Sequence, residues 1–188
     1  MSEPRSALIV IDVQRGILAI PGLVRKAEIE GALDNVVRRI CDLIERARRS
    51  GSPVFFVQHD GGSGHRLEPG TDGWKLRAEL VPDPGDPIIR KRASDAFFET
   101  RLHSELVARR ISRLAIAGCM TQFCVDTSVR RAVSLGFDTI LASDAHTTAD
   151  SETLRFEQIV AHHNALLDGF DAGDHEVRVL PSAEIIFE

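Results

Sequence analysis

ALIVI, residues 7–11, is a continuous run of aliphatic side chains, several of them β-branched. Such a run is typical of a parallel strand that is buried on both faces of a sheet. An amphipathic stretch follows and ends at Gly51, a residue type that commonly terminates a helix. Its apolar positions, spaced as one face of a helix, are Val36, Val37, Ile40, Ile44 and Ala47. The start of the chain therefore predicts a buried strand followed by a helix.

The same alternation continues along the chain. Further short apolar segments predict strands at 53–57, 87–90, 114–118, 138–142 and 177–180. Helices are expected over 99–110, 124–135 and 151–168, the first with an apolar stripe of Leu102, Leu106 and Val107. Strand–helix alternation favours an α/β fold. We predict a single domain over residues 1–188, a three-layer sandwich whose six-stranded, mostly parallel, doubly wound (Rossmann-like) sheet has helices on both faces.

The composition is that of a soluble globular protein, with 43% hydrophobic and 27% charged residues among 188. A net charge of −5 argues against a nucleic-acid-binding surface, which needs a concentrated basic face. No run approaches the ~20 apolar residues of a membrane span, and the first residues lack the features of a signal peptide. Three cysteines form no disulfide framework, so we expect reduced thiols in a cytoplasmic protein. Cys41 and Cys119 have the sequence surroundings of core residues.

Residues 58–86 break the alternation. They include HDGGSGHRLEPGTDGW (59–74), which is rich in glycine, and the whole segment is longer than an ordinary connection. Loops of this length often act as lids or substrate-binding loops, and a disordered excursion is the alternative. We expect a lid or substrate loop here.

Three side chains with complementary chemistry follow predicted strands. Asp12, Lys91 and Cys124 come after the first, third and fourth of them. Ligands of open α/β sheets bind at the carboxyl ends of the strands, so an acid, a cation and a thiol are expected on one edge. Each residue alone also has a structural interpretation: Asp12 as a turn cap, Lys91 as a surface residue and Cys124 as a core residue. Their joint placement favours a functional site.

The three groups suit acyl transfer to a cysteine. If Thr121 is the N-cap of the following helix, Cys124 lies in the first turn, where the helix dipole lowers the pKa of a thiol. A neighbouring Lys91 ammonium lowers that pKa further. Asp12 can accept the thiol proton and later deliver it to a leaving group. Cys124 is therefore the predicted nucleophile.

Four segments, in this order, resemble the isochorismatase-like cysteine hydrolases, a family that includes nicotinamidases and N-carbamoylsarcosine amidohydrolase. They are LIVIDVQRG (8–16), IIRKRASDAFFETRL (88–102), GCMTQFCVDTSVRRAVSLGF (118–137) and LASDAHTTAD (141–150). The match covers nearly the whole chain and implies that Asp12, Lys91 and Cys124 are the catalytic residues. It also implies a cis peptide bond before Met120, with the backbone N–H groups of Met120 and Cys124 forming an oxyanion hole.

Differences within that family narrow the expectation. Isochorismatases themselves cleave a vinyl ether and lack the cysteine, so Cys124 favours hydrolysis of a C–N bond. Nicotinamidases carry a metal site after the second strand, an aspartate followed two residues later by histidine, and QHDGGSGH (58–65) departs from that spacing. The metal-free branch is therefore expected, with no cofactor, although His59, Asp60 and His65 leave an improvised metal site open.

Other histidines have structural interpretations. Adjacent His162 and His163 point about 100° apart on a helix, so we expect packing or an oligomer contact rather than shared metal ligation. His146 is expected to cap a turn after the fifth strand, with an approach to the active edge as the alternative.

Candidate substrate-binding residues lie near the catalytic positions. Gln14 can hydrogen-bond to substrate or to the long loop, and Phe97 and Phe123 can wall a cleft. Trp74, in the long loop, suits either a lid over a planar amide or an anchor of the loop to the core.

The sequence thus predicts a cysteine-dependent amidohydrolase that cleaves an amide, carbamoyl or lactam C–N bond of a small molecule through a thioester. The alternatives are an isochorismatase-type ether hydrolase, a lactam hydrolase that releases no ammonia, and a non-catalytic oligomeric thiol protein. The resemblance also implies a homo-oligomer, a dimer or larger. We expect neither a nucleic-acid partner nor a membrane partner.

Overall fold

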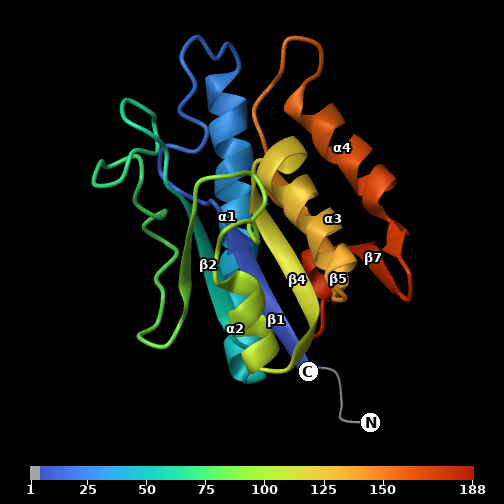
Figure 1. The fold of residues 1–188 in the computed structure, drawn as a ribbon. Helices are drawn as coiled ribbons and strands as arrows, with labels where there is room; N and C mark the ends of the chain where they lie inside the picture. The colour runs from blue at the N-terminus through green and yellow to red at the C-terminus, as the bar shows by residue number, and fades with distance from the viewer. Residues whose placement is uncertain (1–4) are drawn as a thin grey trace.

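A computed structural model describes residues 5–188 of the chain (Figure 1). Its centre is a seven-stranded sheet in the order β3-β2-β1-β4-β5-β7-β6. The strands are β1 (Arg5–Ile11), β2 (Val54–His59), β3 (Ile88–Lys91), β4 (Ile111–Cys119), β5 (Asp138–Thr147), β6 (Asp171–Ala172) and β7 (His175–Leu180). Neighbouring strands are parallel except β6 and β7. The α/β sandwich is confirmed, and the predicted six strands become seven because β6, with two residues, is too short to give an apolar pattern.

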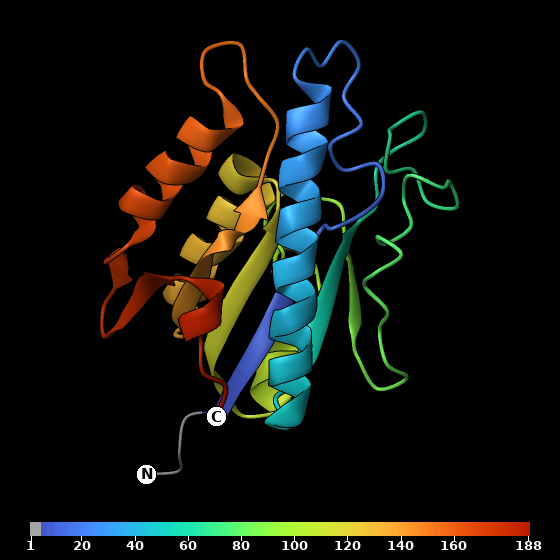
Figure 2. The ribbon, with the colours of Figure 1, turned by 180° about the vertical axis from the view of Figure 1, so that it is seen from behind.

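Helices cover both faces of the sheet. α1 (Lys26–Arg49) lies on one face (Figure 2), and α2 (Leu102–Ala108) and α3 (Asp126–Ser134) lie on the other (Figure 1). α4 (Phe156–Leu167) packs against β5 and β7. None of the helices within residues 5–188 combines the length and the apolar character needed to cross a bilayer.

Side chains on the two faces of β1 pack into two separate hydrophobic cores. Leu8 and Val10 pack with the buried side of α1, which contains the apolar positions that the helical spacing predicts. Ile9 and Ile11 pack on the opposite face with α2 and α3. This alternation on a strand with neighbours on both sides explains why 7–11 is apolar throughout.

Each of the three helices expected after residue 51 is shorter than its sequence pattern predicts, including α3, which was expected over 124–135. Glu99 (φ 52°) and Arg110 (φ 56°) have left-handed backbone conformations, so the helix expected over 99–110 shrinks to α2. Val107 is exposed, unlike the other two positions of the expected stripe. The helix expected over 151–168 begins later, at the start of α4.

β1 and β4 lie unusually close together at Gly118. Gly118 pairs with Ile11, has φ +131°, and a Cβ atom added to it would lie 2.1 Å from the Ile11 carbonyl oxygen. Glycine alone fits this backbone conformation and this approach. Since Asp12 follows Ile11 with a left-handed φ of 52°, Gly118 helps to fix the backbone that carries Asp12.

We expect Gly118→Ala to lower the free energy of unfolding by about 3 kcal/mol or more, because the methyl group would push β1 away from β4. Urea denaturation followed by circular dichroism measures this loss. Gly31→Ala is the control, since Gly31 lies in α1 with no atom within 4 Å of an added Cβ. That change is expected to add about 0.5–1 kcal/mol. Wild-type stability of Gly118→Ala would contradict the close approach.

Candidate active site

The structure brings Asp12, Lys91 and Cys124 together at the carboxyl edge of the sheet. Asp12 follows β1, Lys91 is the last residue of β3, and Cys124 lies in the turn after β4. Lys91 Nζ is 2.6 Å from Asp12 Oδ2 and donates a hydrogen bond to Cys124 Sγ at 3.2 Å. The side chains of Asp12 and Lys91 are both fully buried. A surface-lysine interpretation of Lys91 is therefore wrong.

The Lys91 ammonium has a partner for each of its protons. Besides Asp12 and Cys124, it donates to the Ala93 carbonyl oxygen at 2.9 Å. Within residues 5–188, the Asp12 carboxylate meets no donor other than the Lys91 ammonium and the Cys124 thiol. An acid with so few donors retains capacity to accept a proton.

Burial dominates the protonation of these groups. It raises the pKa of Asp12, against the lowering effect of the Lys91 charge. Burial acts to lower the pKa of Lys91, but the Asp12 charge and the contact with Cys124 outweigh it, so Lys91 stays protonated with a raised pKa. Burial, followed by the Asp12 charge, raises the pKa of Cys124 to about 12. The expectation of a lowered thiol pKa is therefore corrected: the resting thiol is protonated and is poised to give its proton to Asp12.

Cys124 lies in a π-helical turn, Thr121–Val125, that leads directly into α3. The expected N-cap role of Thr121 is wrong, because its hydroxyl pairs with the ring of His146 at 2.9 Å instead of with the helix backbone. The Cys119–Met120 peptide bond is cis, as the resemblance implies. Among the residues described, the Met120 N–H has no acceptor, and the Cys124 N–H has none outside its own turn.

A buried hydrogen-bond chain holds this turn from behind. His146 is 2% exposed, and its Nε2 lies 2.8 Å from Asn164 Oδ1. Asn164 Nδ2 donates to the Ser143 carbonyl, so Asn164 Oδ1 is the acceptor and His146 Nε2 carries the proton. His146 Nδ1 then accepts from the Thr121 hydroxyl. His146 thus links β5 and α4 to the cysteine turn rather than capping a turn, a role that no local sequence signal indicates.

We expect His146 to make stability depend on pH. Burial lowers its pKa to about 4, whereas the unfolded chain takes up the proton near the ordinary value of about 6.5. The stabilisation is complete above pH 6.5 and is lost as the pH falls towards 4, by about 3 kcal/mol. His146→Gln should lose that much less between pH 6.5 and 4 in urea titrations. His162→Gln, at an exposed position of α4, should keep the wild-type pH dependence.

Gln14 binds the long loop. Its side chain is fully buried, and its amide nitrogen donates to the carbonyl oxygens of His59 (3.0 Å) and Trp74 (2.8 Å). Its amide oxygen accepts from the His59 N–H at 2.9 Å. Gln58 also donates to the Trp74 carbonyl, at 2.8 Å. Of the two roles expected for Gln14, the geometry favours the loop contact over a substrate contact.

Trp74 is held by charged neighbours. Its Nε1 donates to Asp60 Oδ1 at 2.9 Å, and the Arg90 guanidinium lies 4.4 Å from its ring centroid. Arg90 also pairs with Asp60 at 2.6 Å. The side chain therefore anchors the loop to β3, and its role as a lid over substrate stays a prediction.

The two candidate phenylalanines differ in exposure. Phe97 is buried and stacks on Phe137 in the core beneath α2 and α3, with 6.3 Å between ring centroids. Phe123, next to the nucleophile position in the π-helical turn, is half exposed. The geometry leaves Phe123 the freer of the two to touch a ligand, and a substrate contact remains a prediction for both.

The candidate metal-binding residues at the start of the long loop, His59, Asp60 and His65, do not converge on one point. The Asp60 carboxylate is bound by Trp74 and Arg90, and the rings of His59 and His65 are 5.8 Å apart. Within residues 5–188, no group of three or more His, Cys, Asp or Glu side chains is arranged to hold a metal ion.

The other cysteines lack the surroundings of a nucleophile. Cys119 is fully buried, and burial raises the pKa of its thiol far above the ordinary range. Cys41 is only half-buried, which corrects its expected core position, and its thiol donates to the Glu79 carbonyl at 3.7 Å. Among the described residues, neither thiol contacts both a cation and a carboxylate, as Cys124 does.

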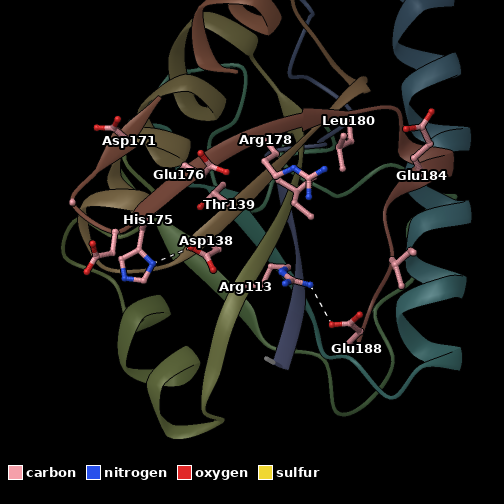
Figure 3. Close-up of a pocket in the computed structure, with 14 residues that line it drawn as sticks. Arg113, Asp138, Thr139, Asp171, His175, Glu176, Arg178, Leu180, Glu184 and Glu188 are labelled. Carbon is pink, nitrogen blue, oxygen red and sulfur yellow. Dashed lines mark hydrogen bonds and ion pairs between the residues drawn. The ribbon is translucent and has the colours of Figure 1, made fainter. Parts of the chain in front are cut away.

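A large surface depression lies away from this chemistry. It has a volume of about 680 Å³ and opens at the starts of β4 and β5 beside β7 and the C-terminal residues (Figure 3). Ion pairs join charged side chains across it, Arg113 with Glu188 and His175 with Asp138. Asp12, Lys91 and Cys124 do not line it.

The sequence is similar to those of known hydrolases. The Isochorismatase domain family matches residues 6–168. The chain is 35% identical over 144 residues to a streptothricin hydrolase of Streptomyces noursei, covering 77% of this chain and 50% of that protein. It is 32% identical over 171 residues to the ureidoacrylate amidohydrolase RutB of Variovorax paradoxus (strain S110), covering 74% and 68%. The chain thus spans about half the length of the streptothricin hydrolases that it matches.

Solved structures show the same architecture. An isochorismatase from Pseudomonas putida KT2440 superposes with a TM-score of 0.83 at 30% identity, covering 99% of this chain and 94% of that chain. The N-carbamoylsarcosine amidase from Thermoplasma acidophilum superposes with a TM-score of 0.75 at 24% identity, covering 96% and 98%, and is similar in fold.

Proposed function

This chain belongs to the isochorismatase family of hydrolases, and from that premise we propose that it is a cysteine-dependent amidohydrolase. Its reaction opens an amide, carbamoyl or lactam C–N bond of a small molecule through a thioester on Cys124. The observation that carries the proposal is the Lys91 ammonium, which contacts both Asp12 at 2.6 Å and Cys124 at 3.2 Å. A nucleophile, a base and a fixed cation in contact are the parts that such chemistry needs.

Attack begins with a proton transfer from Cys124 to Asp12. The thiol is protonated at rest, because its pKa lies near 12, so the thiolate forms as the sulfur approaches the carbonyl carbon. Burial raises the pKa of Asp12, which makes the carboxylate a stronger base. Lys91 keeps its charge and stabilises the developing thiolate.

The oxyanion forms beside the π-helical turn. In the proposed mechanism the backbone N–H groups of Met120 and Cys124 donate to it. Support comes from the Met120 N–H, which has no other acceptor within residues 5–188. Donors that are already fixed in place stabilise the tetrahedral intermediate without reorganisation.

Asp12 then returns its proton to the leaving nitrogen, and the C–N bond breaks to give an amine or ammonia and a Cys124 thioester. Water attacks the thioester while Asp12 takes a proton from it. The C–S bond breaks, the carboxylic acid leaves, and the thiol regains its proton. The enzyme returns to its starting protonation state.

The setting of the enzyme is part of the same proposal. The family resemblance implies a homo-oligomer, and the free thiols of Cys41, Cys119 and Cys124 favour a reducing cytoplasm. The substrate is a small molecule.

Ammonia release from a panel of small amides, carbamoyl compounds and ureides tests the proposal. We expect release from at least one class, together with the corresponding acid by mass spectrometry. Turnover of a lactam without ammonia release would narrow the proposal to that C–N bond, and turnover of a vinyl ether alone would replace it with the alternative bond. No detectable turnover of any compound class would contradict the proposal.

A further inference from the structure

Arg66 lies beside the nucleophile turn, although it belongs to the long loop between β2 and β3. Its Nε donates to the Ile17 carbonyl at 3.1 Å, which fixes the start of the guanidinium. One terminal nitrogen, Nη2, lies 3.7 Å from Met120 Sδ. The residue is partly buried, and burial lowers the pKa of its guanidinium, whereas a negative charge on Cys124 acts in the opposite direction, so the two groups are within electrostatic reach.

No carboxylate of residues 5–188 forms an ion pair with the Arg66 guanidinium. Among residues 5–188, its polar contacts are the Ile17 carbonyl and the Met120 sulfur, whereas nearby Arg90 is paired with Asp60. Burial lowers the pKa of Arg66, so the lost hydration of its charge is not compensated.

The surrounding charges do not supply an anion either. Lys91 and Asp12 form a neutral pair. The Asp60 carboxylate is paired with Arg90. Arg66 therefore leaves the site with one unbalanced positive charge.

We propose that Arg66 determines specificity by binding an anionic group of the substrate, a carboxylate next to the scissile amide. This inference rests on the proposed function, and it names the substrate class as amides or ureides that also carry a carboxylate. Both terminal nitrogens of Arg66 keep N–H groups free to bind it, which suits a planar, bidentate anion.

Alkylation of Cys124 tests the charge effect without any turnover. Iodoacetate and iodoacetamide are similar in size and differ in charge, and the modified peptide is quantified by mass spectrometry. We expect the iodoacetate-to-iodoacetamide rate ratio at Cys124 to fall about 10-fold in Arg66→Met, because the variant loses the positive charge that attracts the anionic reagent. Arg66→Lys should keep most of the wild-type ratio.

Arg178→Met is the matched control. It removes the same charge at an exposed position of β7, remote from Cys124, and should leave the ratio within about 2-fold of wild type. Melting temperatures verify that each variant is folded. An unchanged ratio in folded Arg66→Met would overturn the inference.

Substrate pairs then test specificity. Malonamate, succinamate and glutaramate are compared with their methyl esters, which have the same amide without the charge. For the acid that is turned over, Arg66→Met should lower kcat/KM at least 10-fold through KM, with kcat within about 3-fold and no loss on the ester. Equal losses on acid and ester would overturn the inference. A changed alkylation ratio with no turnover of any amide would leave the anion site standing and reject the proposed function.

Discussion

Replacing Cys124 with alanine should abolish turnover and leave the fold intact. Without sulfur no thioester forms, and the loss relative to wild type is expected to be at least about 10⁴-fold, as for other enzymes that lose a covalent nucleophile. The fold should tolerate the change, because Lys91 keeps its contacts with Asp12 and with the Ala93 carbonyl. Product formation and the urea midpoint are measured on the same preparation.

Two further cysteine variants make this result specific. Cys124→Ser keeps the shape but carries an alcohol that is far harder to deprotonate, so we expect less than about 1% of wild-type activity. Cys41→Ala removes a half-buried thiol that lacks the cation and the carboxylate, and should stay fully active. In wild type, rapid acid quenching with an accepted amide should yield a Cys124 adduct whose mass is that of the acyl group.

Activity of Cys124→Ala at the wild-type level would reject the mechanism. No turnover by wild type on any substrate, combined with unselective thiol modification, would favour the alternative of a non-catalytic thiol protein. The intact contacts among Asp12, Lys91 and Cys124 argue against that alternative, because a buried ion pair is costly to retain without a use.

The sequence predicts the framework of the site well, because strand ends can be read locally. Each buried strand is a short apolar run, and in a parallel sheet the residues after such runs meet at one edge. Asp12, Lys91 and Cys124 can therefore be grouped from the sequence alone. The sequence does not predict the short edge strand β6, since two residues are too few to show a hydrophobic periodicity.

Contacts between distant segments could not be predicted in the same way. A π-helical turn at 121–125 has nearly the same apolar spacing as the start of an α-helix, so the sequence also allows Thr121 as an N-cap. The partners of His146 lie 25 residues before it and 18 residues after it. Gln14 bonds to Trp74, 60 residues away. Only the path of the loop brings such groups together.

The direction of the Cys124 pKa shift also depends on contacts that the sequence does not predict. A helix start and a nearby cation are visible in the sequence, and both lower a thiol pKa. Burial and the distance to Asp12 depend on packing, and these two effects dominate and raise the pKa. The thiol is therefore activated by the proton transfer to Asp12 that accompanies attack, and not in the resting enzyme.

Replacing Lys91 with methionine should damage both stability and catalysis. The change leaves the fully buried Asp12 carboxylate without its cation, and we expect the free energy of unfolding at pH 7 to fall by about 3–5 kcal/mol. Turnover should fall by about 10³-fold, because the developing thiolate loses its fixed positive charge. Lys75→Met, at an exposed position, should change stability by less than about 0.5 kcal/mol.

The pH dependence of Lys91→Met identifies the cause of the damage. Without Lys91, the pKa of Asp12, already raised by burial, rises further above its unfolded value near 4. A folded-state pKa above the unfolded one favours the folded state as the pH falls, so relative to wild type Lys91→Met should regain stability on acidification through that raised pKa.

A double variant separates the buried charge from the catalytic role. Lys91→Met combined with Asp12→Asn removes both charges, so most of the lost stability should return in urea denaturation at pH 7. Activity should not recover, because the base and the fixed cation are both missing. If the double variant were as unstable as Lys91→Met, the loss would come from packing around the lysine side chain rather than from an unpaired carboxylate. A stable and active Lys91→Met protein would remove Lys91 from the mechanism altogether.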